Sequence, residues 1–262
     1  MQLGLLRPRR LEVFQQAQEL GLRFVEFACN VNNDLTEFFN QIQQYKRESE
    51  RTGVSVGSIG RWGSDRINKD GSIIEEELEI SYQLIDAAQQ LGCPLFVCGC
   101  NYVEELSLYD NATAAIQYFT RVLEYGKSRG VRIATYNCHW NCFVVDDHAW
   151  RLIHGHLPDL GIKYDPSHSR QAGQDYIKEA RDWGHRFYHV HLKGSVVIEG
   201  QRFDDPPAGM DQTDWPTFMS ILYTHRYSGK LSIEPHSETW RDELWEKGVR
   251  YTIDYFNKLL FR

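Results

Sequence analysis

The sequence lacks the features that place a protein in a membrane or outside the cell. No apolar run approaches the roughly 20 residues that span a bilayer. The first ten residues hold only a four-residue apolar run before a basic segment, too short for the apolar region of a signal peptide. We therefore predict a cytoplasmic protein with no membrane partner.

Paired cysteine motifs are also missing. The chain has six cysteines, but no Cys-x-x-Cys pair occurs. Without an export signal, free thiols in a reducing compartment are favoured over disulfides. A zinc cluster built from Cys98, Cys100, Cys138 and Cys142 is the alternative.

Positive charge is in deficit and scattered. The 29 Lys and Arg residues face 36 Asp and Glu residues, which gives a formal charge of −7. This balance argues against a nucleic-acid partner, whose phosphates need a basic patch. No glycine-rich loop typical of phosphate binding is present, which favours a substrate without phosphate.

What the chain does contain is a regular alternation of strand-like and helix-like segments. Each apolar strand pattern is followed by a helical stripe, and the first four stripes end at a glycine. Eight such units in about 250 residues predict a (β/α)8 TIM barrel of the α/β class, with residues 1–262 as one domain. The predicted strands are 2–6, 24–29, 54–59, 94–98, 131–136, 161–164, 185–191 and 230–233. The predicted helices are 10–20, 33–53 with Asn33 as cap, 72–92 opened by a Ser72/Glu75 capping box, 111–129, 146–156, 174–183, 213–224 and 238–260.

Polar side chains follow the last four predicted strands. The carboxyl ends of barrel strands face one pocket, so these side chains are expected to meet there. Carboxylates and an imidazole suit Mn²⁺, Mg²⁺, Co²⁺ or Zn²⁺. Each segment alone can also be explained by an ordinary structural role. An Asp after a strand often caps a helix, and a buried His is often a hydrogen-bonded core residue. The segments are Asn137-Cys138-His139, Asp165-Pro166-Ser167-His168, His191-Leu192-Lys193 and Glu234-Pro235-His236.

With these residues, the chain resembles the sugar isomerase and epimerase superfamily built on the xylose isomerase-like barrel, which includes tagatose and psicose epimerases, hydroxypyruvate isomerase and inosose dehydratases. The most specific segments are 165–168, 189–193 and 232–235. The resemblance implies that Asp165, His191 and Glu234 bind a divalent metal, with Mn²⁺ the foremost candidate. It also implies that His168 contacts a substrate hydroxyl.

The chain departs from the family pattern after the fifth strand. The family usually places a ligating Glu where this sequence has Asn137. An amide oxygen can still ligate a metal, but it carries no negative charge and cannot accept a proton. His139, two residues further on, is therefore the candidate for a second acid–base group, with capping or packing as its plainer reading.

Further residues complete the expected site. Glu234 is the expected base that takes a proton beside a carbonyl, while Lys193 and His168 hold hydroxyls or polarise the carbonyl. Three more residues are expected to contact the substrate: Arg202 from a long polar loop at 194–215 that can act as a lid, Trp140 through its ring, and Glu26 from the far wall. Three histidines, His148, His154 and His156, are expected at the surface of an outer helix.

Four functions remain open at this point. The leading hypothesis is a metal-dependent isomerase or epimerase whose partner is a small-molecule sugar. A lyase that performs β-elimination on a keto-sugar uses the same base and metal. An endonuclease IV-like enzyme would need a basic face and more metal ligands, and a sugar-binding barrel without activity is the fourth. The oligomeric state is open, with a homo-oligomer possible.

Overall fold

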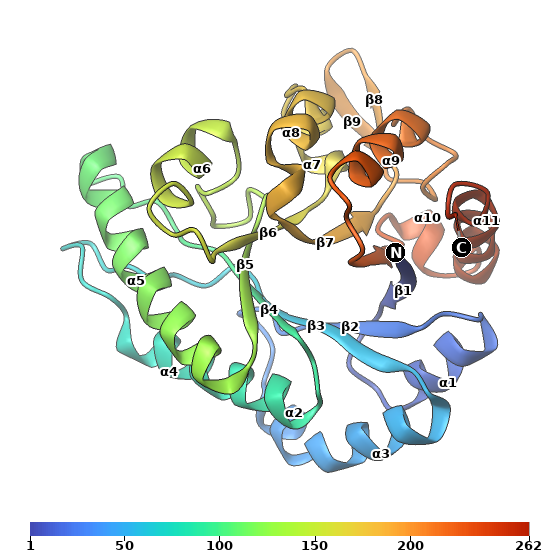
Figure 1. Cartoon of the computed structure of the whole chain (residues 1–262), viewed down its shortest axis with the longest axis horizontal. Coiled ribbons are helices and arrows are strands. Elements are labelled where there is room, and N and C mark those ends of the chain that lie inside the picture. The colour runs from blue at the N-terminus through green and yellow to red at the C-terminus, as the bar shows by residue number, and fades with distance from the viewer. Residues whose placement is uncertain (262) are drawn as a thin grey trace.

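Eight parallel strands close into a barrel in the computed structural model, which describes residues 1–261. Their order around the barrel is β1-β10-β7-β6-β5-β4-β3-β2. The predicted (β/α)8 architecture is confirmed (Figure 1). The barrel strands are β1 (Gln2–Leu6), β2 (Phe24–Ala28), β3 (Ser55–Arg61), β4 (Leu95–Cys98), β5 (Arg132–Tyr136), β6 (Gly161–Tyr164), β7 (Phe187–Leu192) and β10 (Lys230–Ile233).

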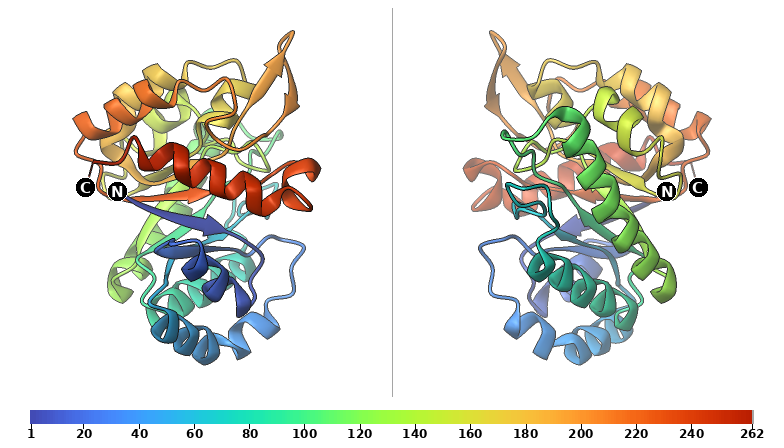
Figure 2. Two further views of the ribbon diagram at one scale, coloured as in Figure 1. Left: turned by 90° about the vertical axis from the view of Figure 1, so that its right-hand side faces the viewer. Right: turned by 90° about the vertical axis from the view of Figure 1, so that its left-hand side faces the viewer.

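Helices surround the barrel and connect its strands, as the views from two sides show (Figure 2). No helix among residues 1–261 is long and apolar enough to cross a membrane. The helices are α1 (Glu12–Glu19), α2 (Thr36–Asn40), α3 (Ile42–Thr52), α4 (Glu75–Gln90), α5 (Leu108–Arg129), α6 (Asp147–Ile153), α7 (Pro166–Gln171), α8 (Tyr176–Trp183), α9 (Trp215–Thr224), α10 (Glu238–Arg241) and α11 (Trp245–Asn257), with a 3-10 turn at Gly184–Arg186.

Several helix ends differ from the prediction. The segment expected as one helix after Asn33 is two helices, and the first begins after Leu35, so Asn33 is not its cap. The expected capping box is also wrong, because α4 begins after Ile74 and the hydroxyl of Ser72 donates to Asp70 instead. The closing helix is likewise divided into α10 and α11. Local sequence favours these caps, but the tertiary connections set where each helix begins.

The long segment after β7 is more ordered than a polar loop. It forms an antiparallel hairpin of β8 (Val196–Ile198) and β9 (Gln201–Asp204). Figure 2 shows this hairpin projecting away from the barrel. The hairpin is anchored at its base, where the buried carboxylate of Asp205 lies 2.7 Å from Arg202 and 2.7 Å from His236.

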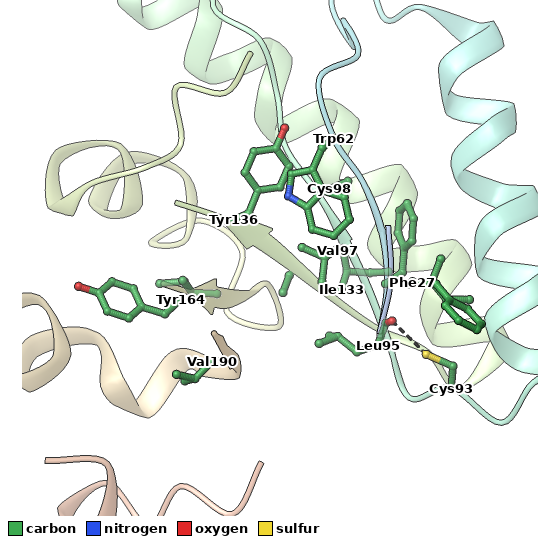
Figure 3. Packing of buried hydrophobic residues seen from close by; sticks show 14 of the residues in the cluster. Phe27, Trp62, Cys93, Leu95, Val97, Cys98, Ile133, Tyr136, Tyr164 and Val190 are labelled. Atoms are coloured by element: carbon green, nitrogen blue, oxygen red, sulfur yellow. Dashed lines mark hydrogen bonds between the residues drawn. The ribbon is translucent and has the colours of Figure 1, made fainter. Parts of the chain in front are cut away.

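Apolar side chains fill the layer between strands and helices (Figure 3). At the mouth of the barrel the rings of Trp62 and Tyr136 stack with centroids 5.8 Å apart. Inside the barrel, Phe24 fills the lower end. Gly4 and Gly57 leave room for its ring, because a Cβ at either would lie within 2.5 Å of a ring carbon. Above Phe24 the interior is polar, whereas barrel interiors are usually filled by branched aliphatic residues.

One expected surface residue belongs to the core. His154 is fully buried, and its Nε2 lies 3.1 Å from the hydroxyl of Thr135 and 3.2 Å from the carbonyl of Gly161. It follows α6 directly and faces the strands, which corrects the expectation that it is exposed. Burial lowers the pKa of His154 to about 3, so the ring is neutral. His148 and His156 are exposed as expected.

Candidate metal centre

Asp165, His191 and Glu234 converge at the carboxyl ends of β6, β7 and β10. One ligand atom from each lies within 4.8 Å of the others. Asp165 is fully buried, His191 is 1% exposed and the side chain of Glu234 is 16% exposed. The arrangement follows from adjacency in the barrel, since these three strands are neighbours and each side chain projects inward.

Asp165 serves two purposes at once. Its Oδ1 accepts a hydrogen bond of 2.9 Å from the backbone N–H of Ser167 and so caps α7. Its Oδ2 lies 3.3 Å from Nζ of Lys193 and 3.4 Å from Nε2 of His168, and makes no hydrogen bond with residues 1–261. Burial alone raises the pKa of Asp165, but Lys193, with smaller contributions from His168 and Lys163, outweighs this effect and holds the pKa below its usual value.

His191 lies between two carboxylates. Its Nδ1 is 2.6 Å from Glu234 Oε2, and its Nε2 is 2.9 Å from Glu26 Oε2. Burial opposes a charge on the ring, yet Glu26 and Glu234 together raise the pKa of His191. Burial likewise raises the pKa of Glu234 on its own, but Lys193 and His191 hold it well below the usual value. Glu234 is therefore ionised.

Glu26 sits beneath these groups, inside the barrel. Its Oε2 accepts from the hydroxyl of Ser232 at 2.5 Å and lies 2.8 Å from Nε2 of His189. These contacts cross the barrel, because β2 and β7 are not neighbours. Against the effect of burial, His191 and His189 keep the pKa of Glu26 well below its usual value. Glu26, His189 and His191 form a second group capable of holding a metal.

Lys193 and His168 form the remaining part of the cluster. Lys193 is 1% exposed, and its ammonium donates to Nε2 of His168 at 3.1 Å. Burial and the neighbouring Lys193 lower the pKa of His168 to about 3. His168 is therefore neutral, and because its Nε2 accepts from Lys193, its proton lies on Nδ1. Lys193 is therefore a buried residue that lines the pocket, not a solvated surface lysine.

Asn137 does not present its oxygen to the cluster. Its Oδ1 accepts from the backbone N–H of Asp165 and its Nδ2 donates to the carbonyl of the same residue, both at 2.9 Å. Nδ2 also donates to the hydroxyl of Ser169 at 3.2 Å. The amide is therefore engaged at both ends, with the backbone of Asp165, and the expectation that Asn137 is a metal ligand stays a prediction.

A pocket of about 960 Å³ opens above these side chains. Trp140, expected to contact a sugar, is in its wall and 43% exposed. Two other expected contacts and the expected acid–base group are not in the wall. Glu26 is fully buried, Arg202 pairs with Asp205, and His139, the acid–base candidate, is exposed. The lining residues include Arg7, Arg9, Trp62, Cys138, Trp140, Lys163, His168, His191, Lys193, Glu234, His236 and Arg241.

Lys163 is a pocket residue that sequence reasoning missed. It lies in β6 two residues before Asp165, so both side chains face the barrel interior. The residue is 2% exposed and lines the pocket. A charged residue at an inward position of a short buried strand was the available signal.

The residues present suit a divalent cation at the rim. The donors are two carboxylates and an imidazole, and the buried Oδ2 of Asp165 makes no hydrogen bond within residues 1–261. Glu26 occupies the other ring nitrogen of His191, as carboxylates commonly do behind a metal-ligating histidine. Neither candidate group among these residues includes a cysteine, so nothing supports the alternative zinc cluster.

Comparison with known proteins identifies the class of protein that has this barrel and this rim of carboxylate and imidazole groups. Residues 14–257 match the family described as xylose isomerase-like TIM barrel. The chain belongs to this family, as the resemblance in its sequence implied.

Solved structures share the fold over nearly the whole chain. D-Allulose 3-epimerase from Methylomonas sp. has a TM-score of 0.78 at 14% identity, covering 99% of this chain and 98% of that one. D-Psicose 3-epimerase from Clostridium cellulolyticum H10 has a TM-score of 0.78 at 12% identity, with 100% of both chains covered. The 3-keto-D-glucoside 4-epimerase from E. coli has a TM-score of 0.76 at 17% identity, covering 98% of this chain and 99% of that one. At such identities the likeness shows the fold alone.

A curated relative matches part of the chain. The Bacillus subtilis (strain 168) protein YfiH is 25% identical over 173 residues, which is 58% of this chain and 54% of that protein. The match thus spans about half the length of this relative.

Proposed function

We propose that the protein is a divalent-metal-dependent sugar isomerase or epimerase that removes a proton beside a carbonyl. The observation that carries this proposal is the convergence of Asp165, His191 and Glu234 within 4.8 Å at the floor of a large pocket. The epimerases with the same fold act on sugars according to their names, which supports the choice of substrate class. Mn²⁺ is the first cation to test.

A cation held by Asp165, His191 and Glu234 would polarise the substrate carbonyl and stabilise the charge that develops on its oxygen. Glu234 accepts the proton, because it is ionised and partly exposed to the pocket. Its low pKa makes it a weak base, so the reaction depends on stabilising the oxyanion rather than on basicity. The buried ammonium of Lys193 supplies part of that positive charge.

A site with a single base favours proton transfer between neighbouring carbons over an epimerisation that needs two bases. His139, the candidate for a second acid–base group, is exposed and outside the pocket wall. Glu234 can return the proton to the adjacent carbon on the same face, which yields aldose–ketose isomerisation. His168 presents a neutral ring with its proton on Nδ1, suited to hold a substrate hydroxyl.

The test is deuterium exchange from D2O into a panel of aldoses, ketoses and keto-glycosides, followed by NMR. Exchange with Mn²⁺-loaded protein and a loss of about 10²- to 10⁴-fold in Glu234→Gln are expected. Glu246→Gln, which alters an exposed carboxylate on α11, is the control. Release of water or an aglycone without interconversion would favour the lyase, and sugar binding without any exchange would favour the inactive barrel.

A further inference from the structure

The pocket is cationic although the protein is acidic overall. The chain carries a formal charge of −7. The pocket wall nevertheless has five Lys and Arg residues against three carboxylates. A wall of this sign attracts anions and repels cations. The five cationic residues are Arg7, Arg9, Lys163, Lys193 and Arg241, and the three carboxylates are Glu234, Glu238 and Asp242.

Lys163 is a cationic residue at the floor whose side chain has no direct partner. Within residues 1–261 its side chain makes no hydrogen bond and no ion pair shorter than 4.0 Å, although its charge helps to lower the pKa of Asp165 and of Glu234. The two nearest candidates are already engaged, since Asp165 pairs with Lys193 and Glu234 pairs with His191. Lys163 is 2% exposed and lines the pocket, so an anion in the pocket would give its ammonium a direct partner.

Two arginines at the mouth are fixed in orientation without a direct ion pair. The guanidinium of Arg7 lies over the ring of Trp245, 4.3 Å from its centroid. Arg9 lies over Phe38 and donates from Nη1 to the carbonyl of Ala28 at 2.8 Å. Neither has a carboxylate within 4.0 Å among the described residues. Stacking holds the plane of a guanidinium and leaves N–H groups at its edge for an anion.

We propose that the substrate of this pocket carries an anionic group, a carboxylate or a phosphate, and that Lys163 binds it. The inference rests on the proposed sugar function and narrows its substrate class to sugar acids or sugar phosphates. Lys163 lies in the strand that also leads to Asp165, so the anionic group lies near the reacting end of the substrate. The arginines at the mouth draw the anion in and add specificity. The absence of a glycine-rich phosphate loop favours the carboxylate.

The experiment measures dissociation constants by calorimetry for matched sugars. Each set contains a neutral pentose or hexose, the corresponding sugar acid and the corresponding sugar phosphate, tested with and without Mn²⁺. Wild-type protein is expected to bind the acid or the phosphate about 10- to 100-fold more tightly than the neutral sugar, the range for a hydrogen bond to a charged group. The tighter of the two charged ligands identifies the anion.

Variants separate charge from packing. Lys163→Met is expected to lose the preference for the anion while its affinity for the neutral sugar changes less than about threefold. Lys163→Arg keeps a charge and is expected to keep part of the preference. Lys230→Met removes another inward lysine, at the opposite end of the barrel over Phe24, and is expected to keep the full preference.

Three outcomes overturn the inference. Equal affinity of the wild-type protein for neutral and charged sugars would overturn the inference. A preference for the charged sugar that survives in Lys163→Met would also overturn it. In both cases continued deuterium exchange into neutral sugars would leave the proposed function standing. No binding of any sugar in the panel would overturn the proposed function, and the inference with it.

Discussion

The side-chain amide of Asn137 forms a pair of hydrogen bonds with the backbone of Asp165. Oδ1 accepts from the N–H of Asp165 and Nδ2 donates to its carbonyl, both over 2.9 Å. The pair joins the ends of β5 and β6, at the point where the chain turns into α7. Asn137 therefore positions Asp165, whereas its sequence position led us to expect an amide oxygen that ligates the metal.

This relationship predicts the behaviour of Asn137→Ala. The substitution removes two buried hydrogen bonds to Asp165 and is expected to lower the free energy of unfolding by about 1–3 kcal/mol. Bound metal, measured by elemental analysis after dialysis against Mn²⁺, is expected to stay at the wild-type stoichiometry. Loss of the metal with unchanged stability in urea would instead identify Asn137 as a ligand.

Asp165→Asn tests the metal site with little change in shape. Asparagine can still accept from the N–H of Ser167, so α7 keeps its cap. The variant loses one ligand charge and is expected to bind Mn²⁺ at least about 100-fold more weakly, measured by competition with a chelating dye. Asp182→Asn, which alters a partly exposed carboxylate on α8 that pairs with Lys178, is the matched control. Equal affinity in wild type and Asp165→Asn would exclude Asp165 from the site.

Glu26→Gln tests the group behind the metal ligand. Glu26 orients His191 by its contact with Nε2 of the imidazole ring, and Glu26 itself is shielded from the pocket. Replacing such a carboxylate is expected to weaken metal binding about 10- to 100-fold. The same dye competition measures the change. A complete loss of metal would show that Glu26 belongs to the ligand set of the deeper group with His189.

Local patterns were sufficient to predict the barrel. Strand alternation and helical stripes ending at Gly53 and Gly130 indicated eight units, and both glycines close helices in the left-handed conformation. The patterns did not predict the hairpin at 196–204, since short polar strands resemble loops. Nor did they predict α7, which depends on the carboxylate of Asp165 as its cap.

The rim of the site was predictable and its interior was not. Asp165, His191 and Glu234 follow neighbouring strands, and parallel strands bring such residues together. The contact of Glu26 with His189 and His191 crosses the barrel, so it depends on strand order and register, which no local pattern encodes.

The buried histidine His154 makes a prediction about acid stability. Burial lowers its pKa to about 3 in the folded protein, whereas an unfolded chain binds the proton near pH 6.5. Between these values the unfolded state binds more protons, so the free energy of unfolding falls as the pH falls through this range. The contribution of His154 to this loss is up to about 1.4 kcal/mol per pH unit.

His154→Gln removes this titrating group and keeps an amide that can donate to the carbonyl of Gly161. Urea denaturation at intervals from pH 6.5 to 5 is expected to give a shallower decline in unfolding free energy for the variant than for wild type. The window stops at pH 5 because the paired carboxylates Glu26, Asp165 and Glu234 lose their own stabilising contribution at lower pH. His156→Gln, an exposed position two residues further on, is the control. Parallel curves for wild type and His154→Gln would contradict this prediction. They would mean that His154 takes up its proton in the folded protein as readily as in the unfolded chain. Burial of the ring against Thr135 and Gly161 opposes such uptake.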